Sequence, residues 1–242
     1  MHRFFISSAQ FTNENISLDG EIAHQLSRVL RLLPGARILL LDGAGNEAEA
    51  ELTSVPKTGP VLLKIVGRRL AEGEPAIKVT LYQALLKGEK FDWVLQKGTE
   101  LGISSFVPVL TERCISENAR LERWQKIVRE AAEQSRRGIL PQVSSPISFK
   151  EAISQMATTP LALLAWEEEQ TQPLRLTLNS FQTPPTEVAV LIGPEGGLTS
   201  AEAQHAKTAN IKVVGLGKRI LRAETAGPTA AALVLFHFAQ MD

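Results

Sequence analysis

The sequence has very little cysteine and no long apolar run. Cys114 is the single cysteine among 242 residues, which excludes an internal disulfide and a zinc site built on paired cysteines. The histidines are not spaced like metal ligands, so we expect no bound metal. No stretch reaches the roughly 18 uninterrupted apolar residues of a transmembrane helix, and residues 1–15 lack the apolar core of a signal peptide. These absences predict a soluble, cytoplasmic protein.

Net charge is also lacking. Lys and Arg number 26, and so do Asp and Glu, which argues against a protein that coats nucleic acid by charge alone. Lys and Arg nevertheless outnumber the acids between residues 78 and 137, whereas the acids are in excess between residues 138 and 214. This displacement favours a local phosphate-binding face, although a solvated helix with charges paired along its surface has the same composition.

Residues 1–70 have the pattern of a small β domain. A helix is predicted over residues 21–33, where apolar residues recur at helical spacing and Pro34 and Gly35 follow. Three short strands are predicted over residues 37–41, 47–53 and 61–66, with turn-forming residues between them. Short strands this close together indicate a small β-barrel-like domain, and residues 71–75 indicate a linker.

Residues 76–242 alternate between strand and helix patterns. Strands are predicted over residues 78–86, 106–110, 161–165, 187–192 and 211–214. Helices are predicted over residues 91–101, 120–137, 149–156 and 225–240, with one more beginning near Thr199. Gly102 is placed to end the first of these helices, and Glu202 completes a capping box with Thr199. The alternation predicts an α/β domain with a largely parallel sheet covered on both faces.

Two loops at the predicted carboxyl edge of this sheet are candidate ligand sites. Residues 193–197 (GPEGG) follow a buried strand, and their glycines let the backbone approach a ligand closely. Residues 216–225 (LGKRILRAET) follow the last strand and mix apolar side chains with Arg222 and Glu224. Either loop alone would be an ordinary turn or a surface loop with a weak ion pair. Two such loops at one edge favour a shared pocket.

The two loops also carry a resemblance to known proteins. In this order they are similar to those of the SPOUT class of methyltransferases, and the wider pattern resembles the ribosomal RNA small-subunit methyltransferase E family. The matching segments run along nearly the whole chain: RFF at 3–5, HQLSRVLR at 24–31, KGEK at 87–90, QKGTELG at 96–102, ERC at 112–114, EQSRR at 133–137, GPEGG at 193–197 and RILRAETA at 219–226.

The resemblance implies a fold and a reaction that periodicity does not indicate. It implies an N-terminal PUA-like RNA-binding barrel over residues 1–70 and a C-terminal SPOUT domain over residues 76–242. In that domain the chain forms a deep trefoil knot around a pocket for S-adenosyl-L-methionine. The family acts as a homodimer with each active site at the subunit interface. Its reaction is methylation of N3 of one uridine of 16S rRNA, near the decoding centre of the assembled small ribosomal subunit.

We accordingly expect three groups of functional residues. Arg222 and Glu224 are the expected catalytic residues, and which of them handles the N3 proton stays open. Cofactor contacts are expected from three loops: Ala165, Trp166, Glu167, Gly193, Pro194, Glu195, Gly196, Gly197, Leu216, Gly217, Ile220, Leu221, Arg222 and Thr225. RNA contacts are expected from cations and one histidine: Arg3, His24, Arg28, Arg31, Lys87, Lys90, Lys97, Arg136 and Arg137.

Two other functions are compatible with parts of the pattern. A non-catalytic RNA-binding or ribosome-assembly protein would keep the basic residues beside a vestigial pocket. A nucleotide-dependent oxidoreductase shares the alternation of strand, loop and helix. Its GxGxxG motif is absent, however, and no acidic residue stands at the expected later strand end.

Overall fold

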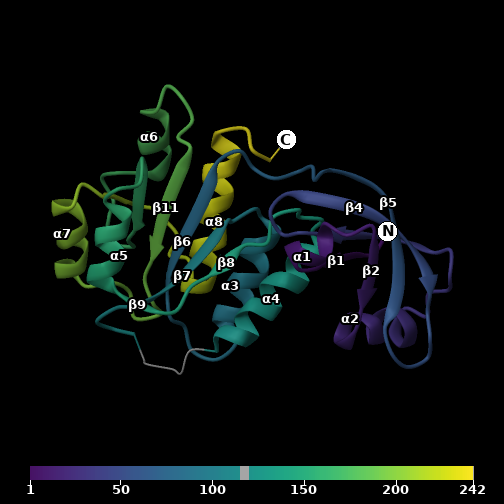
Figure 1. Ribbon diagram of the computed structural model, residues 1–242. Helices are drawn as coiled ribbons and strands as arrows, with labels where there is room; N and C mark the ends of the chain where they lie inside the picture. The colour runs from purple at the N-terminus through teal and green to yellow at the C-terminus, as the bar shows by residue number, and fades with distance from the viewer. Residues whose placement is uncertain (115–119, 242) are drawn as a thin grey trace. The chain divides into compact units, whose positions relative to one another are not determined.

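The chain divides into two compact units. A computed structural model describes residues 1–114 and 120–241 (Figure 1). The first unit comprises Met1–Glu74 and Ala132–Leu140, and the second comprises Pro75–Ala131 and Pro141–Asp242. Residues 132–140, which we expected in the C-terminal domain, thus group with the N-terminal unit. No helix within the described ranges is long and apolar enough to cross a membrane.

The first unit is built on a five-stranded sheet. Its strands run in the order β1-β3-β4-β5-β2, with β1 parallel to β3 and the other neighbours antiparallel. Register shifts in the β4–β5 ladder, next to Ala50 and Ser54, mark bulges that bend these long strands. The bounds of the strands are β1 (Arg3–Phe5), β2 (Asn15–Leu18), β3 (Arg37–Leu41), β4 (Asn46–Ser54) and β5 (Val61–Leu70). A short helix, α1 (Ser8–Phe11), lies between β1 and β2 in the sequence.

The helix that we predicted over residues 21–33 is shorter and partly of another type. α2 (Gly20–His24) continues into a π-helix, η1 (Gln25–Val29). The prediction was wrong at its C-terminal end, because Arg31 has a positive φ of 52° that ends the helical path. Leu26 is fully buried, whereas Leu33 is 73% exposed, so only the first part of the apolar stripe faces the core.

The second unit is an α/β fold on a parallel sheet. The strand order is β12-β10-β11-β6-β7-β8, with β9 also paired to β7, and the paired strands are parallel. The strands are β6 (Lys78–Ala84), β7 (Ser105–Leu110), β8 (Gln142–Val143), β9 (Ile147–Ser148), β10 (Leu161–Ala165), β11 (Glu187–Ile192) and β12 (Lys212–Val214). The helices from residue 75 onward are α3 (Lys90–Glu100), α4 (Leu121–Gln134), α5 (Phe149–Met156), α6 (Leu174–Asn179), α7 (Ser200–Thr208) and α8 (Ala223–His237).

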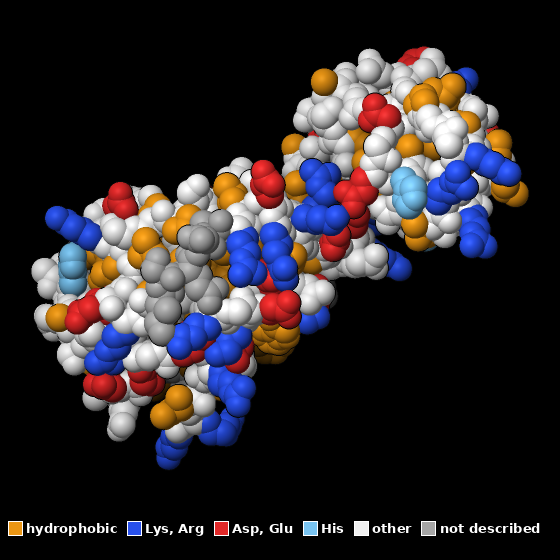
Figure 2. All heavy atoms as spheres, turned by 90° about the horizontal axis from the view of Figure 1, so that it is seen from below, with side chains coloured by type: hydrophobic (Ala, Val, Ile, Leu, Met, Phe, Trp, Pro, Cys, Tyr) orange, Lys and Arg blue, Asp and Glu red, His pale blue; other side chains and the backbone are white. Residues whose placement is uncertain are grey.

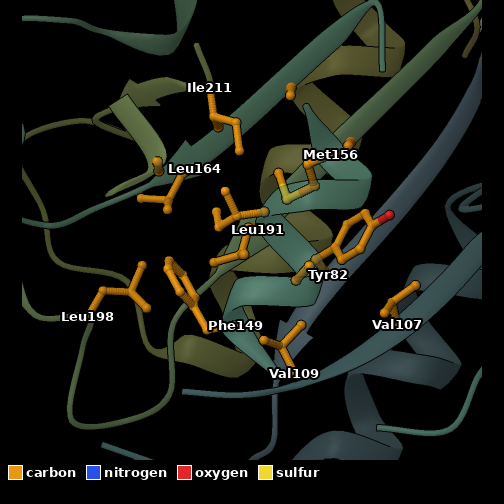
Figure 3. Close-up of a cluster of buried hydrophobic side chains, with 14 of the residues drawn as sticks. Tyr82, Val107, Val109, Phe149, Met156, Leu164, Leu191, Leu198 and Ile211 are labelled. Carbon is orange, nitrogen blue, oxygen red and sulfur yellow. The ribbon is translucent and has the colours of Figure 1, made fainter. Parts of the chain in front are cut away.

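Helices cover both faces of this sheet (Figure 1). On one face, Phe149 of α5 belongs to the apolar cluster that includes Tyr82 of β6 (Figure 3). On the other face, α8 lies against β11 and β6 and packs against α3. Gly227 of α8 faces Leu81 and Gln83, which alternate with Tyr82 along β6 and therefore point away from it. The predicted parallel sheet with helices on both faces is confirmed.

Several predicted elements of this unit have the predicted bounds. These are α5, β10 and β11, and the capping box of Thr199 with Glu202 is present at α7. Gly102 has a φ of 102° just after α3, as its predicted role requires. The positions of β10 and β11 matter most for function, because the candidate loops leave the sheet from their ends.

Other bounds differ from the prediction. The helix predicted to reach Arg137 ends at Gln134, because Arg136 has a positive φ of 64°. α8 begins at Ala223 and ends at His237 rather than spanning 225–240, since Arg222 is its N-cap. β6 ends at residue 84 instead of 86. The short elements α1, α6, β1, β2, β8 and β9 were not predicted, because segments of two to six residues carry too little periodicity.

Candidate active site

Three neighbouring strands of the parallel sheet end at the same level. Ala165 at the end of β10 is in register with Ile192 of β11 on one side and with Val214 of β12 on the other. The loops that follow, residues 166–173 and 193–199 and 215–222, therefore leave the sheet side by side at its carboxyl edge. The structure thus brings together the three loops that we expected to share a pocket.

The loop after β11 depends on its glycines. The N–H of Gly197 donates to the carbonyl of Pro194 at 2.9 Å, which closes a turn within the loop. Gly197 has a positive φ of 70°, a left-handed conformation that side chains disfavour. An added Cβ at Gly193 would lie 2.9 Å from Cγ of Leu198, so this position admits no side chain without movement. The backbone of the loop is therefore free to approach a ligand.

The loop after β10 contacts the loop after β11. The indole Nε1 of Trp166 donates to the carbonyl of Leu198 at 3.4 Å. The carboxylate of Glu167 lies over Gly197, where an added Cβ would collide with Oε1. Trp166 and Glu167, which we expected to contact the cofactor, therefore lie beside the loop after β11.

The loop after β10 also holds the loop after β12. The N–H of Gly215 donates to the carbonyl of Gln172 at 3.0 Å, and the carbonyl of Gly215 accepts from the N–H of Leu174 at 3.1 Å. Glu169 stabilises the loop after β10, because its carboxylate accepts hydrogen bonds from the hydroxyl and N–H of Thr171 and from Nζ of Lys207. These bonds, with the Thr171 hydroxyl foremost, lower the pKa of Glu169 to about 2.

The two expected catalytic residues lie at the start of α8. Arg222 is its N-cap residue, and Glu224 belongs to its first turn. Nη1 of Arg222 is 3.9 Å from Oε1 of Glu224, and the two side chains are 85% and 15% exposed. Oε2 of Glu224 is buried and has no hydrogen-bond partner among the described residues. Since a buried carboxylate oxygen without a donor is costly, a bound ligand that donates to it would be stabilised.

The other residues expected to contact the cofactor in this loop differ in exposure. Leu216, Leu221 and Thr225 are half-buried, whereas Gly217 and Ile220 are exposed. The two leucines can therefore form apolar walls at the edge of the sheet. Across residues 1–114 and 120–241, no group of three His, Cys, Asp or Glu residues is placed to hold a metal ion.

Glu195 connects the loop after β11 to the segment between β6 and α3. Its Oε1 accepts from the backbone N–H of Lys87 at 3.2 Å and from Nζ of Lys90 at 2.8 Å. Burial raises the pKa of Glu195, but the hydrogen bonds from Lys90 and the backbone outweigh burial and leave the pKa below its usual value. The hydrogen bond to Glu195 raises the pKa of Lys90, and the negative charge of Glu224 adds to this effect. Lys87 and Lys90, expected at the RNA, thus lie beside this loop.

In the first unit, the residues expected to contact RNA are not equally accessible. His24, Arg28 and Arg31 are exposed, and Figure 2 shows a histidine and several Lys or Arg side chains together on one face of this unit. Arg3 is only 12% exposed and pairs with the buried Glu47 at 2.8 Å. We therefore leave Arg3 out of the proposed RNA contacts.

Of the remaining expected RNA contacts, Arg136 and Lys97 are accessible to solvent and Arg137 is buried. Arg136 is exposed, and Lys97 pairs with Glu100 on the same helix at 2.9 Å. Arg137 is 5% exposed and forms an ion pair with Glu74 at 2.7 Å. Because breaking a buried pair leaves an uncompensated charge, we assign Arg137 to the packing of its unit and not to RNA.

Two residues at the site were given no role by the sequence. Gln83 of β6 is fully buried, with Nε2 3.5 Å from the carbonyl of Gly193 and with no partner for Oε1 among the described residues. Nη1 of Arg113 donates to the carbonyl of Gly196 at 2.9 Å. The sequence could have pointed to both: Gln83 is a polar residue in a largely apolar strand, and Arg113 lies in the ERC segment that resembles the family.

Comparison with known proteins identifies the family. A family model described as an RNA methyltransferase domain matches residues 73–235, and one described as an RNA methyltransferase PUA domain matches residues 18–66. Ribosomal RNA small subunit methyltransferase E of Synechocystis sp. is 36% identical over 236 residues, which cover 96% of this chain and 77% of that protein. The Bacillus subtilis protein of that name is 34% identical over 238 residues, which cover 93% of each chain.

A solved structure has the same fold over nearly the whole chain. Ribosomal RNA small subunit methyltransferase E from Neisseria gonorrhoeae, bound to S-adenosyl methionine, matches with a TM-score of 0.89 and 35% identity over 98% of this chain and 97% of that chain. The first unit is thus PUA-like, the second is an RNA methyltransferase domain, and the chain belongs to the ribosomal RNA small subunit methyltransferase E family.

Proposed function

We propose that this protein transfers the methyl group of S-adenosylmethionine to N3 of a specific uridine of 16S rRNA. The target lies near the decoding centre and is methylated in the assembled small ribosomal subunit. The observation that carries the proposal is the pair at the start of α8. There the exposed Arg222 lies 3.9 Å from Oε1 of Glu224, whose buried Oε2 has no hydrogen-bond partner among the described residues. This pair lies next to the loops that leave the sheet at one level.

The three loops fit S-adenosylmethionine. The glycines of residues 193–197 let backbone groups reach the adenine and ribose, and the half-buried Leu216 and Leu221 supply apolar walls. Glu167, which lies over Gly197, offers a carboxylate to ribose hydroxyls or to the amino group of the methionine tail. When bound, the cofactor supplies a methyl group already activated by its positive sulfur, so the protein has mainly to align that group with the target nitrogen.

The chemistry requires an acceptor for the N3 proton, because neutral uracil is a poor nucleophile. As N3 bonds to the methyl carbon, the bond from that carbon to sulfur breaks and the N3 proton must leave. Oε2 of Glu224 is the acceptor that we propose, since it is buried and has no donor among the described residues. Arg222 then stabilises the negative charge that develops on the flanking uracil oxygens. Glu224 is largely buried and Arg222 is exposed, and this difference favours Glu224 as the proton acceptor and Arg222 as the group that stabilises charge.

RNA contacts are proposed from basic side chains of both units and from one histidine. The first unit offers His24, Arg28 and Arg31, and the second offers Lys87 and Lys90 beside the loop after β11. Arg136 and Lys97 complete the set. Phosphate contacts of this kind position the RNA, while the target uridine has to leave its stack to reach the cofactor.

A homodimer with each active site at the interface is part of the proposal. Ala226, Gly227 and Ala230 of α8 are buried within their own chain and so are not free for a partner. On the exposed side of α8, Leu233 and Phe236 are 43% and 69% exposed, which suits packing against a second copy. Light scattering at micromolar concentration tests this part, and a clean monomer would contradict it.

The deep trefoil knot is proposed as well. The chain after β12 is bonded to residues 172–174 before α8 returns to lie against β11 and β6. The knot itself is what the family resemblance implies, and the pairing of these two segments at the carboxyl edge is compatible with it.

Methylation followed by base mapping tests the function. The protein is incubated with labelled S-adenosylmethionine and either small ribosomal subunits or naked 16S rRNA. A methyl group on N3 removes the donor used in base pairing, so reverse transcriptase stops at the modified uridine. We expect one such stop in assembled subunits and a weaker one in naked RNA. If the protein bound S-adenosylmethionine and the RNA but transferred no methyl group, a non-catalytic assembly protein would be supported instead.

A further inference from the structure

The conformation of the loop after β11 depends on contacts from outside the loop. Residues 193–197 include three glycines, the residues with the greatest backbone freedom. Within the loop, the bond from Gly197 N–H to the Pro194 carbonyl closes a single turn. A loop that has to become ordered when its ligand arrives binds that ligand more weakly than a loop already in place. Contacts from outside the loop therefore decide how well it is prepared.

Arg113 supplies one such contact from the segment that follows β7. Its Nη1 donates to the carbonyl of Gly196 at 2.9 Å. An added Cβ at Gly196 would lie 3.4 Å from Cβ and 3.7 Å from Cδ of Arg113, so the alkyl part of the arginine runs along the glycine. A charged donor at this distance fixes the direction of one carbonyl in the loop, which packing alone does not achieve.

The segment that carries Arg113 is itself anchored on both sides. The N–H of Glu112 donates to Oε1 of Glu202 at 3.0 Å, while the other carboxylate oxygen of Glu202 caps α7. On the other side, Sγ of Cys114 donates to the carbonyl of Leu85 at 3.2 Å. These bonds hold the backbone on either side of Arg113, so its side chain reaches the loop from a fixed origin.

We propose that Arg113 is a positioning residue, which holds residues 193–197 in their binding conformation and so raises the affinity for the adenosine part of the cofactor. This inference rests on the proposed function, in which that loop binds S-adenosylmethionine. Arg113 is exposed, so its single bond adds little to the stability of the fold. A direct contact with the carboxylate of the methionine tail is a different role, since it would affect only ligands that carry the tail.

Calorimetry of the full-length protein with two ligands separates these roles. S-adenosylhomocysteine carries the amino-acid tail, whereas 5′-methylthioadenosine keeps the nucleoside and lacks the carboxylate. We expect R113Q to lower the affinity for both ligands by the same factor, about 5–20-fold. R113K should recover part of the loss, because an ammonium can donate the same bond. The exposed Arg175 of α6 provides the control, and R175Q should bind both ligands like the parent.

A second readout reports on the loop without any ligand. Backbone amides of Gly197 and Leu198 should exchange with solvent faster in R113Q than in the parent or in R175Q, while the thermal midpoint stays unchanged. A loss confined to S-adenosylhomocysteine would make Arg113 a direct ligand and overturn the inference. Unchanged affinity for both ligands would also overturn it and leave the cofactor site intact. A parent protein that binds neither ligand would overturn the proposed function together with the inference.

Discussion

Arg222 and Glu224 form a loose pair at the first turn of α8, with 3.9 Å between Nη1 and Oε1. This distance is at the outer limit of an ion pair, so the attraction between the two charges is weak. The carboxylate keeps its second oxygen buried and without a donor among the described residues, while the guanidinium stays exposed. Substitutions at the two positions should therefore have separable effects on turnover.

Arg222→Ala is expected to remove most of the turnover and leave cofactor binding nearly intact. Loss of one donor that stabilises developing charge lowers kcat by about 10²–10³-fold. Single-turnover methylation of small subunits gives the rate, and calorimetry with S-adenosylhomocysteine gives the affinity. R175A, at an exposed position of α6, is the control. Near-normal methylation by Arg222→Ala would refute its role.

Glu224→Gln is expected to lower the rate by about 10²–10⁴-fold, the usual contribution of a general base. Raising the pH should restore the activity of this variant more than that of the parent, because uracil N3 then ionises without help. The amide keeps the shape of the side chain and removes a buried charge, so the thermal midpoint should not fall. A variant that is fully active from acid to alkaline pH would rule out Glu224 as the acceptor.

Gly197→Ala is expected to weaken S-adenosylhomocysteine binding by at least about tenfold. A Cβ there meets the carboxylate of Glu167 and also strains a left-handed backbone by roughly 1–2 kcal/mol. Gly59→Ala is a matched control, since Gly59 has a φ of 96° and open space around its Cβ position. Both variants should lose some stability in urea because both strain a left-handed backbone, and only the first should lose ligand affinity. Equal binding by the two would contradict a close backbone approach at Gly197.

Lys90→Ala and Glu195→Gln are expected to change RNA affinity in opposite directions. Nζ of Lys90 is 2.8 Å from Oε1 of Glu195, so an incoming phosphate has to compete with this carboxylate. Removing the lysine should weaken binding and reduce the slope of log K against log salt by about 0.7–0.9. Neutralising Glu195 should tighten binding. Filter binding to 16S rRNA over a salt series measures both, and parallel changes in the two variants would exclude the competition.

Glu169→Gln is expected to lower stability at neutral pH, and this effect should shrink as the pH falls from about 4.5 toward about 2. The folded-state pKa of about 2 lies below the usual 4.5, so the carboxylate contributes fully above about pH 4.5. Its contribution is lost as the pH falls toward about 2. At pH 7 the variant should melt about 2–4 °C below the parent. Glu168→Gln, at the exposed neighbouring position, is the control. A difference as large at pH 2 as at pH 7 would mean that ionisation of Glu169 is not the cause.

The long elements of the second unit were predictable because their patterns are local. β11 is apolar after Glu187 and rich in β-branched residues, and α7 carries its capping box within four residues. The same patterns placed the two loops at the ends of strands, and the resemblance then indicated the ligand that they bind. The first unit was less predictable, since the positive φ of Arg31 ends a helix whose apolar spacing would continue. Backbone strain of this kind leaves no periodic signal.

The sequence by itself determined the alternation of strands and helices, the glycines of residues 193–197 and the family to which these motifs belong. Only the tertiary structure decided which charged residues are available. Arg137 and Arg222 are the same residue type in similarly charged segments, yet one is 5% exposed beside Glu74 and the other is 85% exposed at the start of α8. Likewise, Arg113 gained its contact with Gly196 because two loops distant in sequence meet at one edge of the sheet. The burial and pairing of a charged residue depend on packing between distant segments, so they cannot be predicted from local sequence patterns.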